Sequence, residues 1–340
     1  MGLFGRKSAV GLVIDAEEVR AVELRGSHRM PTLTACGRVP LPEGIVVKGM
    51  INQPEVVAQA LEELWATAGI KDRQVILGIA NPSIMVRFGT FPKVPEDKIA
   101  QMIRYQAKDY LPVALDNIVF DHTILKQIAG DGSALLELML VGAQRDMLDD
   151  FLTTLSMAQL KPQDIDVTSL ALLHVLPETA EEEMLVIVDL ANGLSSITVV
   201  EKGLPRLVRL LSISILEAAH RLGCSLEELV SILDTAETAE IAEEAIYGWI
   251  ESLAGEIRSS LNYYFQGKTD SDAVGQILLT GRGARLKGIT EQLEMNLDIP
   301  TRILRPLDNI KVASGLYPLI YDIAPDFAVS IGLARRGLKE

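Results

Sequence analysis

The residues near the N-terminus whose types suggest chemistry are three acids, Asp15, Glu17 and Glu18, in a short turn between two apolar stretches. Turns at strand ends often hold phosphate groups through inward-pointing backbone N–H groups, and glycine lets the backbone come close to the anion. This turn has no glycine. Two carboxylates about 6 Å from a phosphate would each cost roughly 3 kcal/mol at an effective dielectric constant near 20. A charge-assisted hydrogen bond contributes only about 1.5–3 kcal/mol. The turn therefore argues against a phosphate here, although a solvated hairpin turn alone also explains its acids.

Two later stretches hold the remaining candidates. The turn Asp189–Ser196 begins with an acid and contains Gly193, and Thr280–Gly288 contains Gly281 and Gly283. A strand-to-helix turn explains the second pair of glycines as well as a nucleotide contact does. The sequence has no G-x-S-x-G, Walker A or H-E-x-x-H motif. Its two cysteines and four histidines are not at metal spacing. We therefore predict no catalytic residue and no metal site.

Composition limits the class of protein. The chain has 340 residues, 48% of them hydrophobic, and a net charge of −14. That charge argues against nucleic-acid binding, which needs a basic surface. No apolar run reaches the roughly 18–20 residues of a membrane span, and the N-terminus lacks the pattern of a signal peptide. We therefore expect a cytoplasmic protein.

The elements that must position these residues form a pattern that occurs twice. Strand, turn, strand, turn, strand is predicted over 10–39 and again over 184–211, and Asp189 aligns with Asp15. Helices follow each set, so we predict an α/β protein of two related lobes. The predicted boundaries are 1–80 and 144–178 for lobe 1, 81–143 for a β-rich inserted subdomain, 184–216 and 275–340 for lobe 2, and 217–274 for a helical subdomain.

Four stretches are specific enough to indicate a family: Tyr105–Leu125, Glu256–Phe265, Leu278–Pro306 and Ile323–Gly337. With them the chain resembles the type IV pilus assembly protein PilM family, relatives of FtsA, from about Gly11 to Gly337. The resemblance implies a two-lobed actin-like ATPase (ribonuclease H-like) fold. It also implies a protein at the cytoplasmic face of the inner membrane that binds the N-terminal cytoplasmic peptide of the membrane protein PilN and, usually, ATP with Mg.

The chain departs from the family's first phosphate loop. Val13 stands where the family has an Asp, and Asp15 where it has a Gly. Glu17 and Glu18 replace two hydroxyl residues, and Arg20 alone keeps the positive charge of a Lys.

The other nucleotide motifs are partly kept. Asp189 is present, Ala191 replaces a Gly, and Gly193 is available to restore the turn; Glu256 is present but Ser259 replaces an Arg. In the third motif an arginine replaces a middle glycine, where it would fill the base pocket or stack on a base. The candidate nucleotide-binding residues are therefore Arg20, Asp189, Gly193, Glu256, Gly281, Arg282 and Gly283.

These departures favour a scaffold that does not hydrolyse ATP. A groove for the partner peptide is predicted at Ile79, Phe88 and Phe91, with the peptide adding to the strand Ile84–Phe91, unless these three residues simply belong to the core. Such a scaffold would reach the membrane through its partners and would also contact pilus motor ATPases. Two alternatives remain open: a weak ATPase regulated by nucleotide, and a GspL- or MshI-like component of a type II secretion or pseudopilus machine.

Overall fold

The computed structural model describes residues 8–95, 97–103, 117–128, 134–231, 239–266, 273–316 and 319–338. The chain divides into two compact units: unit 1 comprises Met1–Ala80 and Thr153–Glu340, and unit 2 comprises Asn81–Leu152. Within the described ranges, no helix has the length and apolar character needed to cross a membrane.

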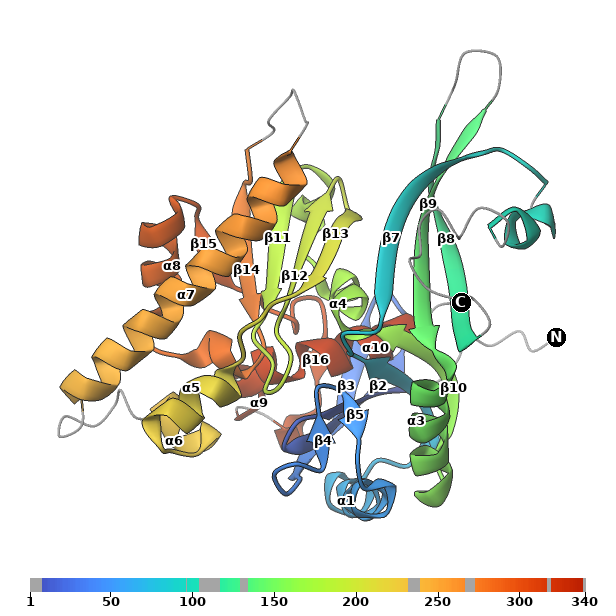
Figure 1. The fold of residues 1–340 in the computed structure, drawn as a ribbon. Coiled ribbons are helices and arrows are strands. Elements are labelled where there is room, and N and C mark those ends of the chain that lie inside the picture. The colour runs from blue at the N-terminus through green and yellow to red at the C-terminus, as the bar shows by residue number, and fades with distance from the viewer. Residues whose placement is uncertain are drawn as a thin grey trace. The chain divides into compact units, whose positions relative to one another are not determined.

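Lobe 1, the first part of unit 1, is built on a six-stranded sheet with the order β10-β6-β1-β2-β3-β16 (Figure 1). Strands β1 to β3 form an antiparallel meander, and β6 and β10 add in parallel beside β1. The strands span Ser8–Asp15 (β1), Glu18–Gly26 (β2), Pro31–Pro40 (β3), Gln74–Ile79 (β6), Lys161–Val167 (β10) and Lys311–Val312 (β16), with a small hairpin of Val46–Val47 (β4) and Met50–Ile51 (β5).

Lobe 2 repeats this arrangement in a five-stranded sheet with the order β13-β12-β11-β14-β15. Its meander is Met184–Asp189 (β11), Ser196–Glu201 (β12) and Leu204–Leu210 (β13), and Gln276–Thr280 (β14) and Thr301–Ile303 (β15) add in parallel. Asp15 ends β1 and Asp189 ends β11. The repeated pattern seen in the sequence is thus a repeated sheet topology.

Helices cover both faces of the lobe 1 sheet. Helix α1 (Pro54–Ala68) begins with proline, ends at Gly69 in the left-handed conformation, and packs its buried side chains on β2 and β3. Helix α10 (Ala328–Gly337) packs on β1, where glycines allow close approach: a Cβ on Gly11 would lie 2.0 Å from the Ser330 carbonyl oxygen.

This packing corrects one predicted boundary. The sequence predicts lobe 2 over all of residues 275–340, but β16 joins the lobe 1 sheet and α10 packs on that sheet. One apolar cluster contains Val22 and Leu24 of lobe 1, Ile331 of α10, and Ile187 and Leu278 of lobe 2. The two lobes therefore share part of their core.

Most of the remaining helices of unit 1 pack in lobe 2. The apolar core of lobe 2 includes Trp249, Ile250 and Ile257 of the 27-residue helix α7. The helices are Thr168–Ala171 (α4), Ile215–Leu222 (α5), Leu226–Ser231 (α6), Ala239–Phe265 (α7), Ile289–Leu297 (α8) and Leu319–Ile323 (α9).

Unit 2 is a three-stranded sheet with the order β7-β9-β8 and a helical segment over 97–103. The strands are Met85–Pro92 (β7), Ile118–Ile128 (β8) and Leu135–Gln144 (β9), and helix α3 (Arg145–Met157) follows. The compact unit ends at residue 152 rather than at the predicted 143 because it includes the first half of α3. Residues 96 and 104–116 lie outside the described residues, and with them the first part of the stretch Tyr105–Leu125.

Candidate functional site

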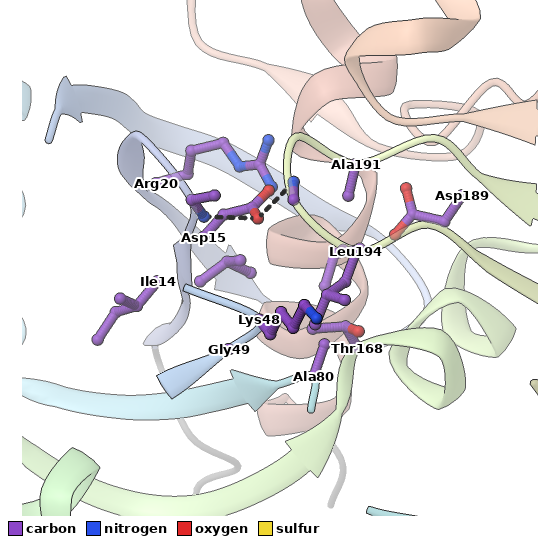
Figure 2. Close-up of a pocket in the computed structure, with 14 residues that line it drawn as sticks. Ile14, Asp15, Arg20, Lys48, Gly49, Ala80, Thr168, Asp189, Ala191 and Leu194 are labelled. Atoms are coloured by element: carbon purple, nitrogen blue, oxygen red, sulfur yellow. Dashed lines mark hydrogen bonds and ion pairs between the residues drawn. The ribbon is translucent and has the colours of Figure 1, made fainter. Parts of the chain in front are cut away.

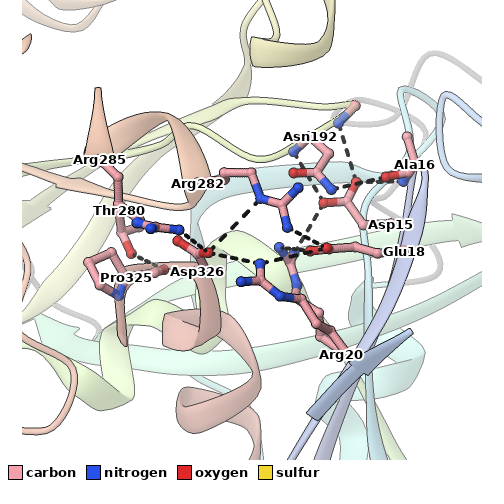
Figure 3. Close-up of polar contacts among 12 residues, drawn as sticks. Asp15, Ala16, Glu18, Arg20, Asn192, Thr280, Arg282, Arg285, Pro325 and Asp326 are labelled. Carbon is pink, nitrogen blue, oxygen red and sulfur yellow. Dashed lines mark hydrogen bonds and ion pairs between the residues drawn. The ribbon is translucent and has the colours of Figure 1, made fainter. Parts of the chain in front are cut away.

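The two equivalent central strands of unit 1 end at a shared site. A two-residue turn, Ala16-Glu17, follows Asp15, with Glu17 at a φ of +65° and half-exposed. The loop after Asp189 is longer and carries Asn192 and Gly193 toward that turn (Figure 3).

The Asp15 carboxylate accepts four hydrogen bonds. The backbone N–H of Asn192 donates to one of its oxygens at 3.2 Å and that of Gly193 to the other at 3.3 Å. The N–H of Ala16, at 2.8 Å, and the Arg20 guanidinium, at 3.1 Å, complete the set. A side chain on Gly193 would not fit, because its Cβ would lie 2.6 Å from that of Ala16. The two turns therefore meet around a carboxylate.

Glu18 joins the same network from the other end of the turn. Its carboxylate accepts from Arg20 at 2.8 Å and from Arg282 of lobe 2 at 2.8 Å. All three residues are at most 5% exposed. Arg282, predicted to fill a base pocket or stack on a base, forms a buried ion pair between the lobes.

Asp326, with no exposed side-chain surface, is the second acidic centre of the network. It accepts from Arg38 of β3 at 3.0 Å and from Arg285 at 3.1 Å, and lies 4.0 Å from Arg282. The described cluster holds four guanidinium groups and four carboxyl groups, namely those of Arg20, Arg38, Arg282 and Arg285 and of Asp15, Glu18, Asp189 and Asp326. At the edge of the cluster, the exposed Glu227 lies 3.4 Å from Arg282. The arginines of this cluster are thus already paired with acidic side chains, and a polyphosphate would have to compete with those acids.

Figure 2 shows the side chains that line a cavity at this site. The cavity lined by Asp15, Arg20, Lys48, Asp189 and Gly193 has a solvent-accessible volume of about 30 Å³. This is room for a water molecule or two, whereas pockets for cofactors and drug-sized ligands measure about 300–1,000 Å³. The cavity is therefore smaller than the pockets that usually hold such ligands.

Asp189 has an unusual environment for an acid. Burial raises the pKa of its carboxyl from 3.8 to about 7, although Arg20 opposes this and Asp15 adds to it. A carboxyl of this kind is largely protonated below neutral pH, which is unsuited to holding a cation there.

We expect Asp189→Asn to flatten the pH dependence of stability. The unfolded chain ionises this group above about pH 3.8, but the folded chain keeps it protonated to about pH 7. Its contribution to stability is therefore complete below pH 3.8 and is lost as the pH rises to 7, at no more than about 1.4 kcal/mol per pH unit. Urea unfolding of parent and variant should be followed at about pH 5 and pH 8 by the fluorescence of Trp65 and Trp249, both in unit 1. Parallel pH profiles of the two proteins would contradict the assignment.

The seven predicted nucleotide residues divide into those that line the cavity and those that do not. Three of them, Arg20, Asp189 and Gly193, line it. Glu256 lies half-exposed on α7 and is not among the residues that line it, and the neighbouring Arg258 donates to the Asn296 carbonyl oxygen at 2.6 Å, tying α7 to α8.

The glycines at 281 and 283 serve close packing. Gly281 has a φ of +79°, and a Cβ there would lie 2.6 Å from an Asp189 carboxylate oxygen. A Cβ on Gly283 would lie 2.6 Å from that of Leu190. The turn after β14 thus needs both glycines without any ligand.

Two of the residues predicted to form the peptide groove, Phe88 and Phe91, lie on opposite faces of the unit 2 sheet. Phe91 is fully buried in the core of unit 2, opposite Leu136. Phe88, three residues earlier, pairs with Met139 on the other face of the sheet and is half-buried. Ile79 is buried in unit 1. Of these three residues, Phe88 is the one whose side chain is partly exposed and so available to a partner.

The sequence interpretation missed Arg38, Asn192, Arg285 and Asp326. A signal existed for the first: Arg20 and Arg38 are directly opposite on β2 and β3. Like charges facing each other on a buried surface require acids nearby. Reading that signal requires the register of the hairpin between β2 and β3. The acid that pairs with Arg38, Asp326, lies 288 residues away in sequence, so no local pattern identifies it.

Comparison with known proteins gives consistent results. The family model described as type IV pilus assembly protein PilM matches residues 11–211 and 217–338. A chain of the solved PilM–PilN type IV pilus biogenesis complex is 25% identical, with a TM-score of 0.85, covering 98% of this chain and 99% of that one. Ethanolamine utilization protein EutJ from Carboxydothermus hydrogenoformans is 14% identical with a TM-score of 0.56, over 98% and 91% of the chains, which indicates a common fold alone. No curated protein matches by sequence.

Proposed function

The chain belongs to the type IV pilus assembly protein PilM family and has a two-lobed actin-like fold, and from this premise we propose that it is a scaffold of pilus assembly that binds a PilN-like membrane protein. The observation that carries this proposal is the near-complete structural match to a chain of a PilM–PilN complex. The scaffold would work at the cytoplasmic face of the inner membrane, reached through its partners, and would also contact pilus motor ATPases.

The proposed scaffold acts without ATP or Mg. The support is electrostatic and steric: the cleft is filled by paired charges and keeps a volume of about 30 Å³. The Asp15 carboxylate takes the backbone N–H groups that an external anion would need. The protein is therefore proposed not to be an enzyme.

The proposed contact for the N-terminal cytoplasmic peptide of the partner is strand β7. In the described part of the chain β7 is an edge strand, so an extended peptide can pair with its free backbone groups. Phe88, half-buried on the sheet face away from the unit's core, would contact a side chain of that peptide.

Titration calorimetry with the synthetic N-terminal peptide of a PilN-like protein tests this function. We expect saturable binding, and we expect Phe88→Ala to weaken it about tenfold, or roughly 1.4 kcal/mol. Val119→Ala is the matched control, because Val119 is 37% exposed on β8, the opposite edge of the sheet.

ATP with Mg should leave the peptide affinity unchanged. A fluorescent ATP analogue that binds in the micromolar range would overturn the nucleotide-free part of the proposal and favour the weak ATPase. Absence of peptide binding, or equal effects of the two variants, would overturn the peptide site.

A further inference from the structure

We propose that the Asp15 carboxylate is the internal ligand of an oxyanion site, and that the site binds a small free oxyanion, such as formate or inorganic phosphate, once this carboxylate is removed. The inference concerns only the cleft of unit 1 and does not depend on the identity of the partner.

The donors are arranged as in a site for an external anion. Each carboxylate oxygen of Asp15 accepts two bonds: one from Ala16 and Gly193, the other from Asn192 and Arg20. Three of the donors are backbone N–H groups, two of them from consecutive residues, an arrangement that forms anion-binding concavities in proteins. The fourth is a guanidinium 3% exposed.

The loop around the carboxylate is built for close approach. Asn192 is fully buried and its side-chain amide donates to the Ala16 carbonyl oxygen at 3.1 Å, which holds the loop against the turn. Gly193 has no side chain at the point where one would strike Ala16. The Asn192 side chain therefore gives the loop a contact with the turn that does not involve the Asp15 side chain.

Both lobes supply donors to this one anion. Ala16 and Arg20 belong to lobe 1, and Asn192 and Gly193 follow β11 of lobe 2. The carboxylate thus connects the donors of the two lobes. Without it, an external anion would be needed to connect them.

The size of the site defines the class of ligand. Asp15 lines the cavity of about 30 Å³, so removing its carboxylate enlarges an existing space by about the volume of one small anion. The buried Glu18–Arg282 pair occupies the adjoining cleft. A carboxylate or phosphate is therefore admitted, and a nucleoside is not.

The test is thermal unfolding of the full-length Asp15→Ala protein, with sodium formate or inorganic phosphate compared with sodium chloride at equal ionic strength. We expect the variant to unfold several degrees below the parent and to regain much of that loss, saturably, with either oxyanion but not with chloride. The parent, whose site is filled, should show no such gain. Asp166→Ala is the matched control, because it removes another largely buried carboxylate, with a side chain 9% exposed, that faces an arginine, Arg336.

Three results would overturn the proposal: no gain of the Asp15→Ala protein over chloride, an equal gain of Asp166→Ala, or a saturable gain of the parent. If Asp15→Ala does not fold, Asp15→Asn keeps the shape but replaces one acceptor oxygen. Hydrogen exchange at the backbone of residues 192 and 193 should then be faster than in the parent and insensitive to phosphate. Unchanged exchange would refute the role of Asp15.

Discussion

Arg20→Met is expected to destabilise unit 1 by about 3–5 kcal/mol, the usual cost of leaving buried charges without their partner. Arg20 is 3% exposed and bonds two carboxylates, those of Asp15 and Glu18. Its removal leaves two acids close together, with Arg282 as the main remaining cation for Glu18. Urea unfolding followed by tryptophan fluorescence gives the free energy of unfolding.

A double variant and an exposed control make this result specific. Glu18→Gln added to Arg20→Met should recover part of the loss, with a coupling energy above about 1 kcal/mol, because one unpaired charge is removed with its partner. Arg305→Met breaks an ion pair between two exposed side chains, Arg305 (81% exposed) and Asp308 (54% exposed). This substitution should therefore lower the free energy of unfolding by less than about 1 kcal/mol. Equal losses for Arg20→Met and Arg305→Met would show that the buried cluster does not stabilise the fold.

Gly11→Ala is expected to cost more than about 4 kcal/mol or to prevent folding of unit 1. The added Cβ would lie 2.0 Å from the Ser330 carbonyl oxygen and 2.7 Å from the Ala334 nitrogen, both backbone atoms of α10. A side-chain change cannot relieve such a clash, so α10 would have to move away from β1. Soluble yield and urea unfolding measure the effect.

Gly248→Ala is the control for this substitution. Gly248 lies within α7, and an added Cβ would meet no atom within 4 Å. Alanine favours a helix over glycine by roughly 0.5–1 kcal/mol, so this variant should be slightly more stable than the parent. A tolerated Gly11→Ala would mean that α10 does not pack on β1 as described.

Much of the fold could be predicted from the sequence because its signals are local. The strands 10–15, 19–25 and 32–39 alternate or are continuously apolar, and α1 has proline at its start and Gly69 at its end. The second meander follows the same order, so the repeat was visible without structure. The two-residue strand β16 has too little pattern to be assigned to a sheet. The apolar residues of α10 suit either lobe, which explains the misplaced boundary.

The site was predictable only in part. The acids at 15, 17 and 18 indicated a turn, and the structure has one at Ala16-Glu17. The sequence could not indicate that Asp15 would bond the other lobe's loop, because Asn192 is 177 positions away. Arg282 and Glu18 are 264 positions apart, and their pairing depends on how the two lobes meet. Both contacts are products of tertiary structure.

The apolar cluster that runs through α10 into both sheets has a mechanical consequence. Moving the lobes apart would expose Ile187 and Leu278 to water in addition to separating buried ions. A force on one lobe is therefore transmitted to the other with little change in the distance between them. We expect unit 1 to behave under tension as a rigid body rather than as two lobes joined by a hinge.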